Sequence, residues 1–377
     1  MFAALAQHDP RLIPRVATMI ARSLLTRAVY VRTDRALPPS TVIARITDRC
    51  NLRCIQCGQW GLRGVYNDAH DRMCTPELDT TQWKRFITRV SRFCPHIYFF
   101  GGEPLLRPDL AELVATASPR MITGVNTNGT LLQHTAASLV DAGLHYIIVS
   151  LDGPHDINNV IRIGPGDAYE SVISGVTQVA REKRRRRSFF PFIKICMTLT
   201  EENQGFIGET ARIARSLGTD AFAVQHGIFT TEALIERSRI HYEQEFKVTA
   251  RYWRGFLRDT TAMDPIAVAQ GIAQARRIFK GFFSRYPSYP FDLKRYFHEP
   301  SRRLCAASCI IPWLHFQIMP QGDTALCEDF PDVIAGNVTK QDPSILWDNS
   351  CYRHFRHVIR TKGIFPACNR CCSYPGF

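Results

Sequence analysis

Three cysteines, Cys50, Cys54 and Cys57, have the types and spacing that most directly indicate chemistry in this chain. Separated by three and two residues, they directly follow a β-rich segment, so one loop could bring three thiolates to a single metal centre. Thiolates suit zinc or iron–sulfur centres. A structural zinc site normally has four protein ligands, and the next candidates are His70 and Cys74. Three ligands on a four-iron cubane would leave one iron open, although the triad alone is also compatible with a zinc knuckle or inert buried cysteines.

A second candidate motif is the turn Gly101-Gly102-Glu103-Pro104, which follows the next β-rich segment. Paired glycines allow a ligand to approach the backbone closely, and Glu103 offers an acceptor for an ammonium group. Alone, such a turn is a weak signal.

Polar residues also follow the ends of two later β-rich segments. Asn126 and Asn128 close one, and Ser150 closes the next, with Arg162 twelve positions beyond it. Barrel-type folds place ligand-binding residues at the carboxyl ends of their strands, so we expect a binding site there. Asn128-Gly129 is also an ordinary turn dipeptide, so capping or turn formation is the alternative.

Together these motifs resemble the radical S-adenosylmethionine (SAM) superfamily. The resemblance implies that Cys50, Cys54 and Cys57 hold a [4Fe–4S] cluster whose fourth iron is chelated by the amino and carboxylate groups of SAM. It also implies that the turn Gly101–Pro104 binds the SAM amine. One departure is Gln56, since the position before the third cysteine is often aromatic in that family.

The Ser150-Leu151-Asp152-Gly153 segment is similar to the branch that includes the anaerobic sulfatase maturases. That likeness implies that Ser150 and Arg162 contact the SAM carboxylate. Asn126 and Asn128 are included as further SAM-binding candidates, although their side chains could simply shape the turn.

The C-terminal part is also rich in cysteine, with Cys305, Cys309, Cys327, Cys351, Cys368, Cys371 and Cys372. Residues 313–326 read as two strands joined by a turn at Gly322, which would bring Cys309 and Cys327 together. Four thiolates from this hairpin and from the pair Cys368 and Cys371 fit a fully ligated zinc or iron–sulfur site.

This spacing resembles the SPASM and twitch modules found behind many radical SAM barrels. The resemblance implies an auxiliary [4Fe–4S] cluster held by Cys309, Cys327, Cys368 and Cys371, where Cys305 or Cys372 could replace one ligand. A full SPASM module continues with further cysteines, whereas this sequence ends six residues after Cys371, so the single-cluster twitch arrangement is the closer match.

The composition and the net charge limit the class of protein and its partners. The 377 residues, of which 45% are hydrophobic, predict a globular protein with a substantial core. The net charge of +13 permits acidic partners without choosing among them, and we do not expect nucleic acid to be one. Neither a secretory signal nor a transmembrane segment is apparent, so we expect a cytoplasmic protein whose thirteen cysteines serve metals rather than disulfides.

Residues 11–32 alternate arginines with apolar residues in the pattern of a basic amphipathic helix. Such a helix can lie on an anionic membrane, which makes peripheral membrane contact one interpretation. The interpretation we favour is a helix packed on the barrel with solvated arginines.

The elements that must position these residues alternate between strands and helices from residue 41 onward, which predicts parallel strands joined by crossovers. We count six such units and expect an α/β fold, a partial (β/α)6 TIM-like barrel with a small cysteine-rich α+β domain. The predicted strands are Thr41–Thr47, His96–Phe100, Met121–Asn126, Tyr146–Leu151, Phe192–Leu199 and Ala221–Gln225. The expected regions are an N-terminal helix (1–40), the barrel (41–225), a helical substrate-related insert (226–300, with helices at His241–Arg258 and Ile266–Arg285) and the auxiliary-cluster domain (301–377).

The predicted function is therefore reductive cleavage of SAM to a 5′-deoxyadenosyl radical, which abstracts hydrogen from a peptide or a small molecule. An external one-electron reductant of the flavodoxin or ferredoxin type is the expected partner, and the auxiliary cluster would aid oxidation or cross-linking. The alternative is an iron–sulfur electron carrier, or a zinc-stabilised binding protein, on a degenerate barrel.

Overall fold

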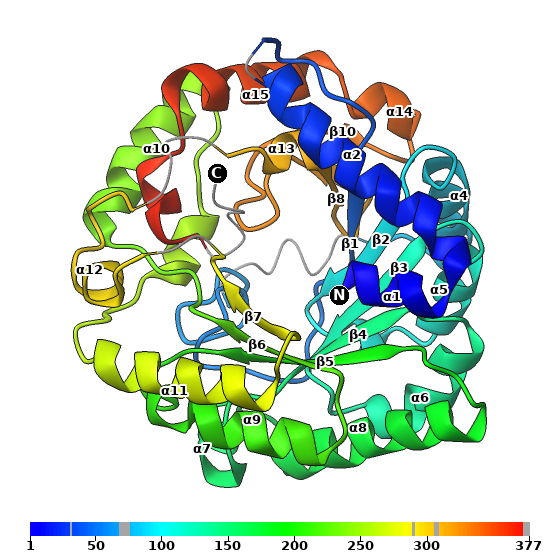
Figure 1. Ribbon diagram of the computed structural model, residues 1–377. Helices are drawn as coiled ribbons and strands as arrows, with labels where there is room; N and C mark the ends of the chain where they lie inside the picture. The colour runs from blue at the N-terminus through cyan, green and yellow to red at the C-terminus, as the bar shows by residue number, and fades with distance from the viewer. Residues whose placement is uncertain (31, 68–75, 289–290, 305–308, 372–377) are drawn as a thin grey trace.

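The fold is an open, strongly curved sheet with helices along its outer side, seen in a computed structural model (Figure 1). The structure describes residues 1–30, 32–67, 76–288, 291–304 and 309–371. His70, Cys74, Cys305 and Cys372 therefore lie outside the described residues.

The centre of the sheet consists of seven strands that pair in parallel in chain order. Each of the six predicted strands is present, which confirms the parallel α/β architecture. The bounds are β1 (Thr41–Thr47), β2 (His96–Gly101), β3 (Ile122–Thr127), β4 (Tyr146–Ser150), β5 (Phe192–Thr198), β6 (Ala221–Gln225) and β7 (Phe283–Tyr286).

Crossover helices bury an apolar face against the outer side of these strands, as α4 illustrates. Trp83 and Phe86 on α4 are buried, while Asp79 and Gln82 form a capping box that satisfies the free N–H groups at the helix start. The crossover helices are α4 (Thr80–Val90), α5 (Leu110–Ala117), α6 (Leu132–Asp141), α7 (His155–Ile161), α8 (Ala168–Arg185), α9 (Ile207–Ser216) and α11 (Pro265–Ile278). Short 3-10 turns lie at η2 (Pro104–Leu106) and η3 (Gln204–Phe206).

The block 226–300 differs from its prediction. A helix was expected over His241–Arg258, but α10 spans Glu232–Phe246 and ends where Lys247 adopts a left-handed conformation (φ 56°), followed by η4 (Tyr252–Phe256). The second predicted helix is confirmed as α11 but ends at Ile278, and the chain then forms β7 and α12 (Leu293–His298).

The C-terminal part joins the same sheet. The predicted hairpin is present as β8 (His315–Ile318) and β9 (Asp323–Ala325), followed by β10 (Ile334–Asn337). Strand β8 pairs in parallel with β1, so one sheet runs across the predicted region boundaries, which stay predictions. The remaining elements are α13 (Ile311–Leu314), α14 (Pro343–Leu346), α15 (Ser350–Lys362) and η5 (Pro366–Arg370).

The N-terminal segment forms α1 (Phe2–His8), η1 (Pro10–Leu12) and α2 (Ile13–Tyr30), which lie near the amino ends of the strands (Figure 1). Leu5, Leu12 and Val16 are buried together with residues of the inner sheet face. The predicted packing on the barrel is therefore confirmed. The expectation that the arginines are simply solvated is wrong for Arg15 and Arg22, which donate to backbone carbonyls. No helix in the described part of the chain combines the length and apolar character needed to cross a membrane.

Candidate functional site

The loop after β1 is attached to the glycine turn after β2. The N–H of Gly102 donates to the carbonyl of Thr47 (2.9 Å), and the N–H of Glu103 donates to that of Arg49 (2.8 Å). Gly101 has a φ of 147°, and a Cβ atom there would lie 2.3 Å from the Thr47 oxygen. The glycines thus let two stretches of this chain's own backbone meet.

This attachment places Cys50, Cys54 and Cys57 on one loop at the carboxyl end of β1. All three are half-buried and free of disulfides, and Cys57 lies close enough to Cys50 and Cys54 to raise the pKa of both thiols. Burial raises the pKa of Cys50 to about 11 and that of Cys54 to about 12. Buried thiolates need a nearby positive charge, which a bound metal cluster would supply.

Cys57 differs in its hydrogen bonds. Its Sγ accepts the backbone N–H groups of Gln59 and Trp60, both at 3.4 Å. Such donors stabilise a thiolate and tune the potential of a cluster bound to it. The donor set therefore fits an iron–sulfur cluster.

A buried polar network links this loop to the end of β4. Arg162, 7% exposed, pairs with the fully buried Asp152 (2.8 Å), and its Nη1 lies 3.9 Å from the Sγ of Cys54. Gln56 donates to the same Asp152 carboxylate (2.6 Å). Complete burial raises the pKa of Asp152, and the charge of Arg162 opposes that rise. Gln56, which departs from the expected aromatic type, therefore ties the cysteine loop to β4.

Arg162 also has unused hydrogen-bonding capacity beside the cysteines. Its Nε is buried without a hydrogen-bond partner among the described residues. An unpaired buried donor on a guanidinium is costly unless an acceptor arrives with a ligand. This geometry fits a carboxylate next to Cys54, as the amino-acid end of SAM requires.

Glu103 lies deeper than its predicted role requires. Its carboxylate is fully buried and accepts bonds from the backbone of Leu105 and Asn128 and from the hydroxyl of Thr127. Burial raises its pKa to about 7, against the opposing effect of these donors. Pro104 is also buried, at the start of η2. The Glu103 side chain thus shapes the turn, and its contact with an ammonium group stays a prediction.

The remaining predicted residues differ in accessibility. Asn128 is buried and holds its own turn, with its amide donating to Asn51 and accepting from Thr130. Asn126 and Ser150 are half-buried near the carboxyl ends of β3 and β4. Asn126 faces the inner side of the sheet, where it lines a cavity.

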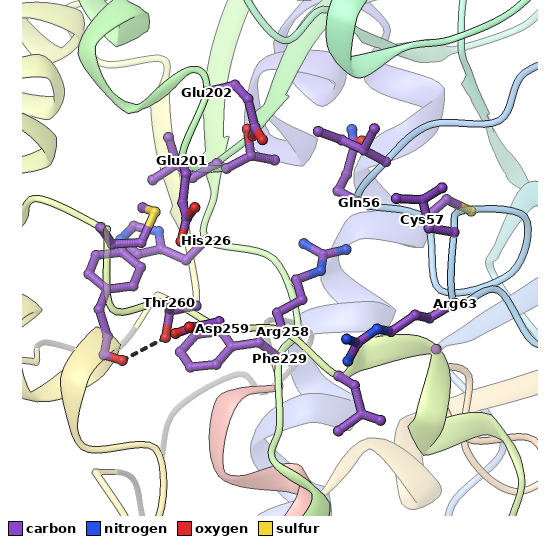
Figure 2. A pocket seen from close by; sticks show the side chains of 18 residues that line it. Gln56, Cys57, Arg63, Glu201, Glu202, His226, Phe229, Arg258, Asp259 and Thr260 are labelled. Carbon is purple, nitrogen blue, oxygen red and sulfur yellow. Dashed lines mark hydrogen bonds between the residues drawn. The ribbon is translucent and has the colours of Figure 1, made fainter.

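A pocket of about 320 Å³ opens beside Cys57 and brings together residues that the sequence did not single out (Figure 2). Glu201 and Glu202, after β5, lie across it from Gln56 and Cys57, and Arg258 points between them. Their position past the carboxyl end of a predicted strand was the signal that could have found the glutamates.

His226 lines the same pocket at the position after β6. Its ring is 3% exposed, and neither ring nitrogen has a hydrogen-bond partner among the described residues. Burial, followed by the charge of Arg285, lowers its pKa to about 3. The neutral ring can therefore donate to or accept from a molecule in the pocket.

The C-terminal cysteines form a second group. Burial raises the pKa of the Cys327 thiol well above its usual value, and nearby Asp329, Cys368 and Cys309 add to this rise. Cys371 donates to the Asp329 carboxylate (3.4 Å). The structure thus brings Cys309, Cys327 and Cys368 near one another, with Cys371 linked to them through Asp329.

Neither cysteine group forms a ready site for one ion. Across residues 1–30, 32–67, 76–288, 291–304 and 309–371, no three His, Cys, Asp or Glu side chains converge tightly enough to hold a single metal ion. Which cysteines bind metal therefore stays a prediction.

Comparison with known proteins gives one family match around each of the two cysteine groups. Residues 45–212 match the family described as the radical SAM superfamily, and residues 309–372 match SPASM, described as an iron–sulfur cluster-binding domain.

Similar curated proteins include pre-heme d1 synthase of Dinoroseobacter shibae, 29% identical over 201 residues (52% of this chain and 46% of that protein). Another is Fe-coproporphyrin III synthase of Methanosarcina barkeri, 37% identical over 144 residues (37% of this chain and 34% of that protein). The alignments span less than half the length of these curated relatives.

Among solved structures, Streptococcus suis SuiB superposes with a TM-score of 0.57 at 14% identity, covering 89% of this chain and 72% of SuiB. A structure of native anSMEcpe with bound AdoMet superposes with a TM-score of 0.57 at 15% identity, covering 84% of this chain and 83% of that one. At these identities the likeness concerns the fold.

Proposed function

We propose that this chain is a radical SAM enzyme, on the premise of its matches to the radical SAM superfamily over residues 45–212 and to SPASM over residues 309–372. The observation that carries the proposal is the meeting of the three-cysteine loop with the unpaired Nε of Arg162 at the carboxyl end of the sheet. A metal cluster and an amino-acid carboxylate would be neighbours there.

In this proposal Cys50, Cys54 and Cys57 hold a [4Fe–4S] cluster. When bound and reduced, this cluster supplies the electron that splits SAM into methionine and a 5′-deoxyadenosyl radical. Arg162 and Ser150 would orient the SAM carboxylate, and Asp152 and Gln56 would fix the guanidinium in place.

The other residues of the site shape it. The turn at Gly101, Gly102, Glu103 and Pro104 would receive the SAM amine, while Asn126 and Asn128 would border the cofactor. The buried surroundings would exclude water from reactive species, which is the main contribution that a protein makes to such chemistry.

We further propose that Cys309, Cys327, Cys368 and Cys371 hold an auxiliary [4Fe–4S] cluster. Its support is the proximity of three of these cysteines and the link of the fourth through Asp329. Its chemistry would be to accept an electron from the substrate or to bind it. Cys305 or Cys372 could replace one ligand.

The partners follow from the same chemistry. A flavodoxin- or ferredoxin-type protein would deliver the electron, in a cytoplasmic setting where thiols stay reduced. The similar proteins include a SuiB structure bound to precursor peptide SuiA and synthases named for heme-type products, which supports either a peptide or a small molecule as substrate.

The test is anaerobic reconstitution of the full chain with iron and sulfide, followed by addition of dithionite and SAM. We expect 5′-deoxyadenosine to be released by the wild type and to be undetectable with Cys54→Ala. The matched control is Cys94→Ala, which removes a buried cysteine outside both groups and should retain the activity. A colourless protein that holds only zinc would contradict the proposal.

A further inference from the structure

A second cavity, of about 530 Å³, lies on the inner side of the sheet. Several of its walls are inward-facing side chains of successive strands: Tyr98, Asn126, Ile148, Cys196 and Gln225. Phe2 and Met19 of the N-terminal helices contribute to the lining at the amino ends of the strands. Its volume is that of a small-molecule site.

Aromatic rings line one wall of this cavity. Tyr98 and Tyr146 both border it, and their rings are nearly parallel, with centroids 6.1 Å apart and an angle of 13°. Tyr98 is oriented similarly to Phe100 behind it in the chain (6.3 Å, 11°). Gly124 makes room for this arrangement, because a Cβ atom there would lie 2.0 Å from the Tyr146 ring. Parallel rings along one wall suit a planar apolar molecule, which can stack on them.

A buried cation faces the same cavity. Lys194 on β5 is 4% exposed, and its Nζ donates to the hydroxyl of Tyr286 (2.9 Å). The same ammonium lies 4.9 Å from the centre of the Tyr286 ring, and no ion pair with an Asp or Glu is found for it in the described part of the chain. A buried ammonium with only a neutral partner is costly, since its lost hydration is not replaced by an opposite charge.

The carboxylate on the cavity wall does not supply that charge. Glu328 lines the cavity and pairs with His315 (3.4 Å). The cavity therefore presents a cation whose counter-charge is missing, next to an aromatic platform.

We propose that this cavity binds the substrate, and that the substrate is a small molecule with a flat apolar body and a carboxylate that pairs with Lys194. A single ammonium beside one hydroxyl matches a carboxylate, which needs a charge partner and a hydrogen-bond donor. This inference rests on the proposed function, because Asn126 borders both the cavity and the predicted SAM site.

The experiment uses two fluorescent probes that differ in one group, 1-pyrenebutyrate and its uncharged analogue 1-pyrenebutanol. Their affinities are measured by fluorescence titration of the reconstituted full chain, with SAM present to fill its own site. We expect the acid to bind more tightly than the alcohol. Lys194→Met should weaken binding of the acid by about 30-fold or more and leave the alcohol unchanged, because the ion pair is buried.

Two further variants keep the test decisive. Lys194→Gln removes the charge but keeps a donor for Tyr286, so it should show the same selective loss if Lys194→Met does not fold. Arg184→Gln removes one exposed positive charge from the end of α8 and should change neither affinity.

Equal affinities of acid and alcohol for the wild type, or an equal loss of acid binding in Arg184→Gln, would overturn the inference. Release of 5′-deoxyadenosine is measured on the same samples. Its absence would refute the proposed enzyme activity, whereas its presence without acid-selective binding would refute only the substrate class.

Discussion

At the scale of single residues, the site depends on contacts that the chain makes with itself. Gly101 and Gly102 are needed because the carbonyls of Thr47 and Arg49 occupy the space that side chains would take. The guanidinium of Arg162 pairs with the Asp152 carboxylate, lies beside the Cys54 thiol and keeps its Nε without a hydrogen-bond partner among the described residues.

Gly101→Ala should destabilise the protein by more than about 1 kcal/mol, because the residue has a positive φ and a Cβ atom would meet the Thr47 carbonyl. Thermal unfolding followed by circular dichroism measures the effect. Gly205→Ala is the matched control, since its Cβ would meet nothing within 4 Å. Equal melting temperatures for the two variants would show that the turn adapts without cost.

Arg162→Lys should weaken SAM binding by about tenfold, because lysine keeps the charge but lacks the Nε donor and the planar fork. Equilibrium dialysis of labelled SAM against the reconstituted protein gives the affinity. Arg181→Lys makes the same chemical change at an exposed position of α8 and should bind SAM as the wild type does. Unchanged affinity in Arg162→Lys would remove this residue from the SAM site.

At the scale of elements, α2 carries apolar side chains that the sheet does not cover. Val16 is buried against the sheet, whereas Ile13, Ile20, Leu24 and Leu25 are 53%, 56%, 63% and 55% exposed. Exposed apolar side chains on a helix that also carries arginines are typical of helices that lie in a membrane interface. The exposed apolar residues of α2 support the proposal that residues 11–32 contact a membrane surface.

The protein should therefore sediment with phosphatidylserine-containing vesicles and not with neutral ones. Leu24→Glu should lower the partition coefficient by about tenfold, since one buried leucine contributes roughly 1.5–3 kcal/mol. Ile266→Glu, which changes an apolar residue that is 69% exposed on α11, should bind as the wild type does. Equal binding by both variants would exclude α2 as the contact.

The observed strands also show which parts of the fold could be predicted from the sequence. Strands such as β1 and β6 were predicted with their observed bounds because they are short segments rich in apolar and β-branched residues. Strand β7 (Phe-Ser-Arg-Tyr) was missed because it is short, half-buried and partly polar. The pairing of β8 with β1 could not be foreseen either, since it joins segments far apart in the chain.

The same contrast holds within the site. The cysteines and the glycine turn follow local spacing, so the sequence identified them as candidates. The partners of Arg162 and the cavity at Lys194 depend on which side chains of neighbouring strands meet, and no local pattern encodes that. The role of Gln56 likewise depends on its hydrogen bond to Asp152, a residue 96 positions away, which no local pattern predicts.

At the scale of the whole molecule, buried histidines should make stability depend on pH. Burial lowers the pKa of His96 to about 3, of His145 to about 4 and of His226 to about 3. The unfolded chain takes up these protons below about pH 6.5, so the stabilisation is complete above that pH and is lost as the pH falls toward 4 and 3. At pH 5 each of these three histidines should lower the free energy of unfolding by ~1–2 kcal/mol relative to its value above pH 6.5.

Urea unfolding between pH 7 and 5 measures this loss. His226→Leu should reduce the pH dependence, because it removes one of the three titrating rings. The replacement breaks no hydrogen bond with the described residues, since neither ring nitrogen has a partner among them. Replacing the exposed His134 by Leu should leave the dependence as it is. A wild-type stability that does not change from pH 7 to 5 would contradict the prediction.

One continuous sheet connects the two cysteine groups. Strand β8 lies between Cys309 and Cys327 in the chain and pairs with β1, which leads directly into the first cysteine loop. A change at the proposed C-terminal cluster should therefore reach the proposed SAM site through one shared strand pair. If the C-terminal region folded on its own, the two sites would respond separately.

Cys327→Ser should lower the iron content from about eight to about four atoms per chain, since one cluster is lost and the other is kept. We also expect one cooperative unfolding transition at a lower temperature and a slower release of 5′-deoxyadenosine, because β8 supports β1. Cys351→Ser, in a half-buried cysteine outside the proposed ligand set, is the control and should keep all iron. Two separate transitions in Cys327→Ser, with SAM cleavage unchanged, would show that the shared sheet does not carry this coupling.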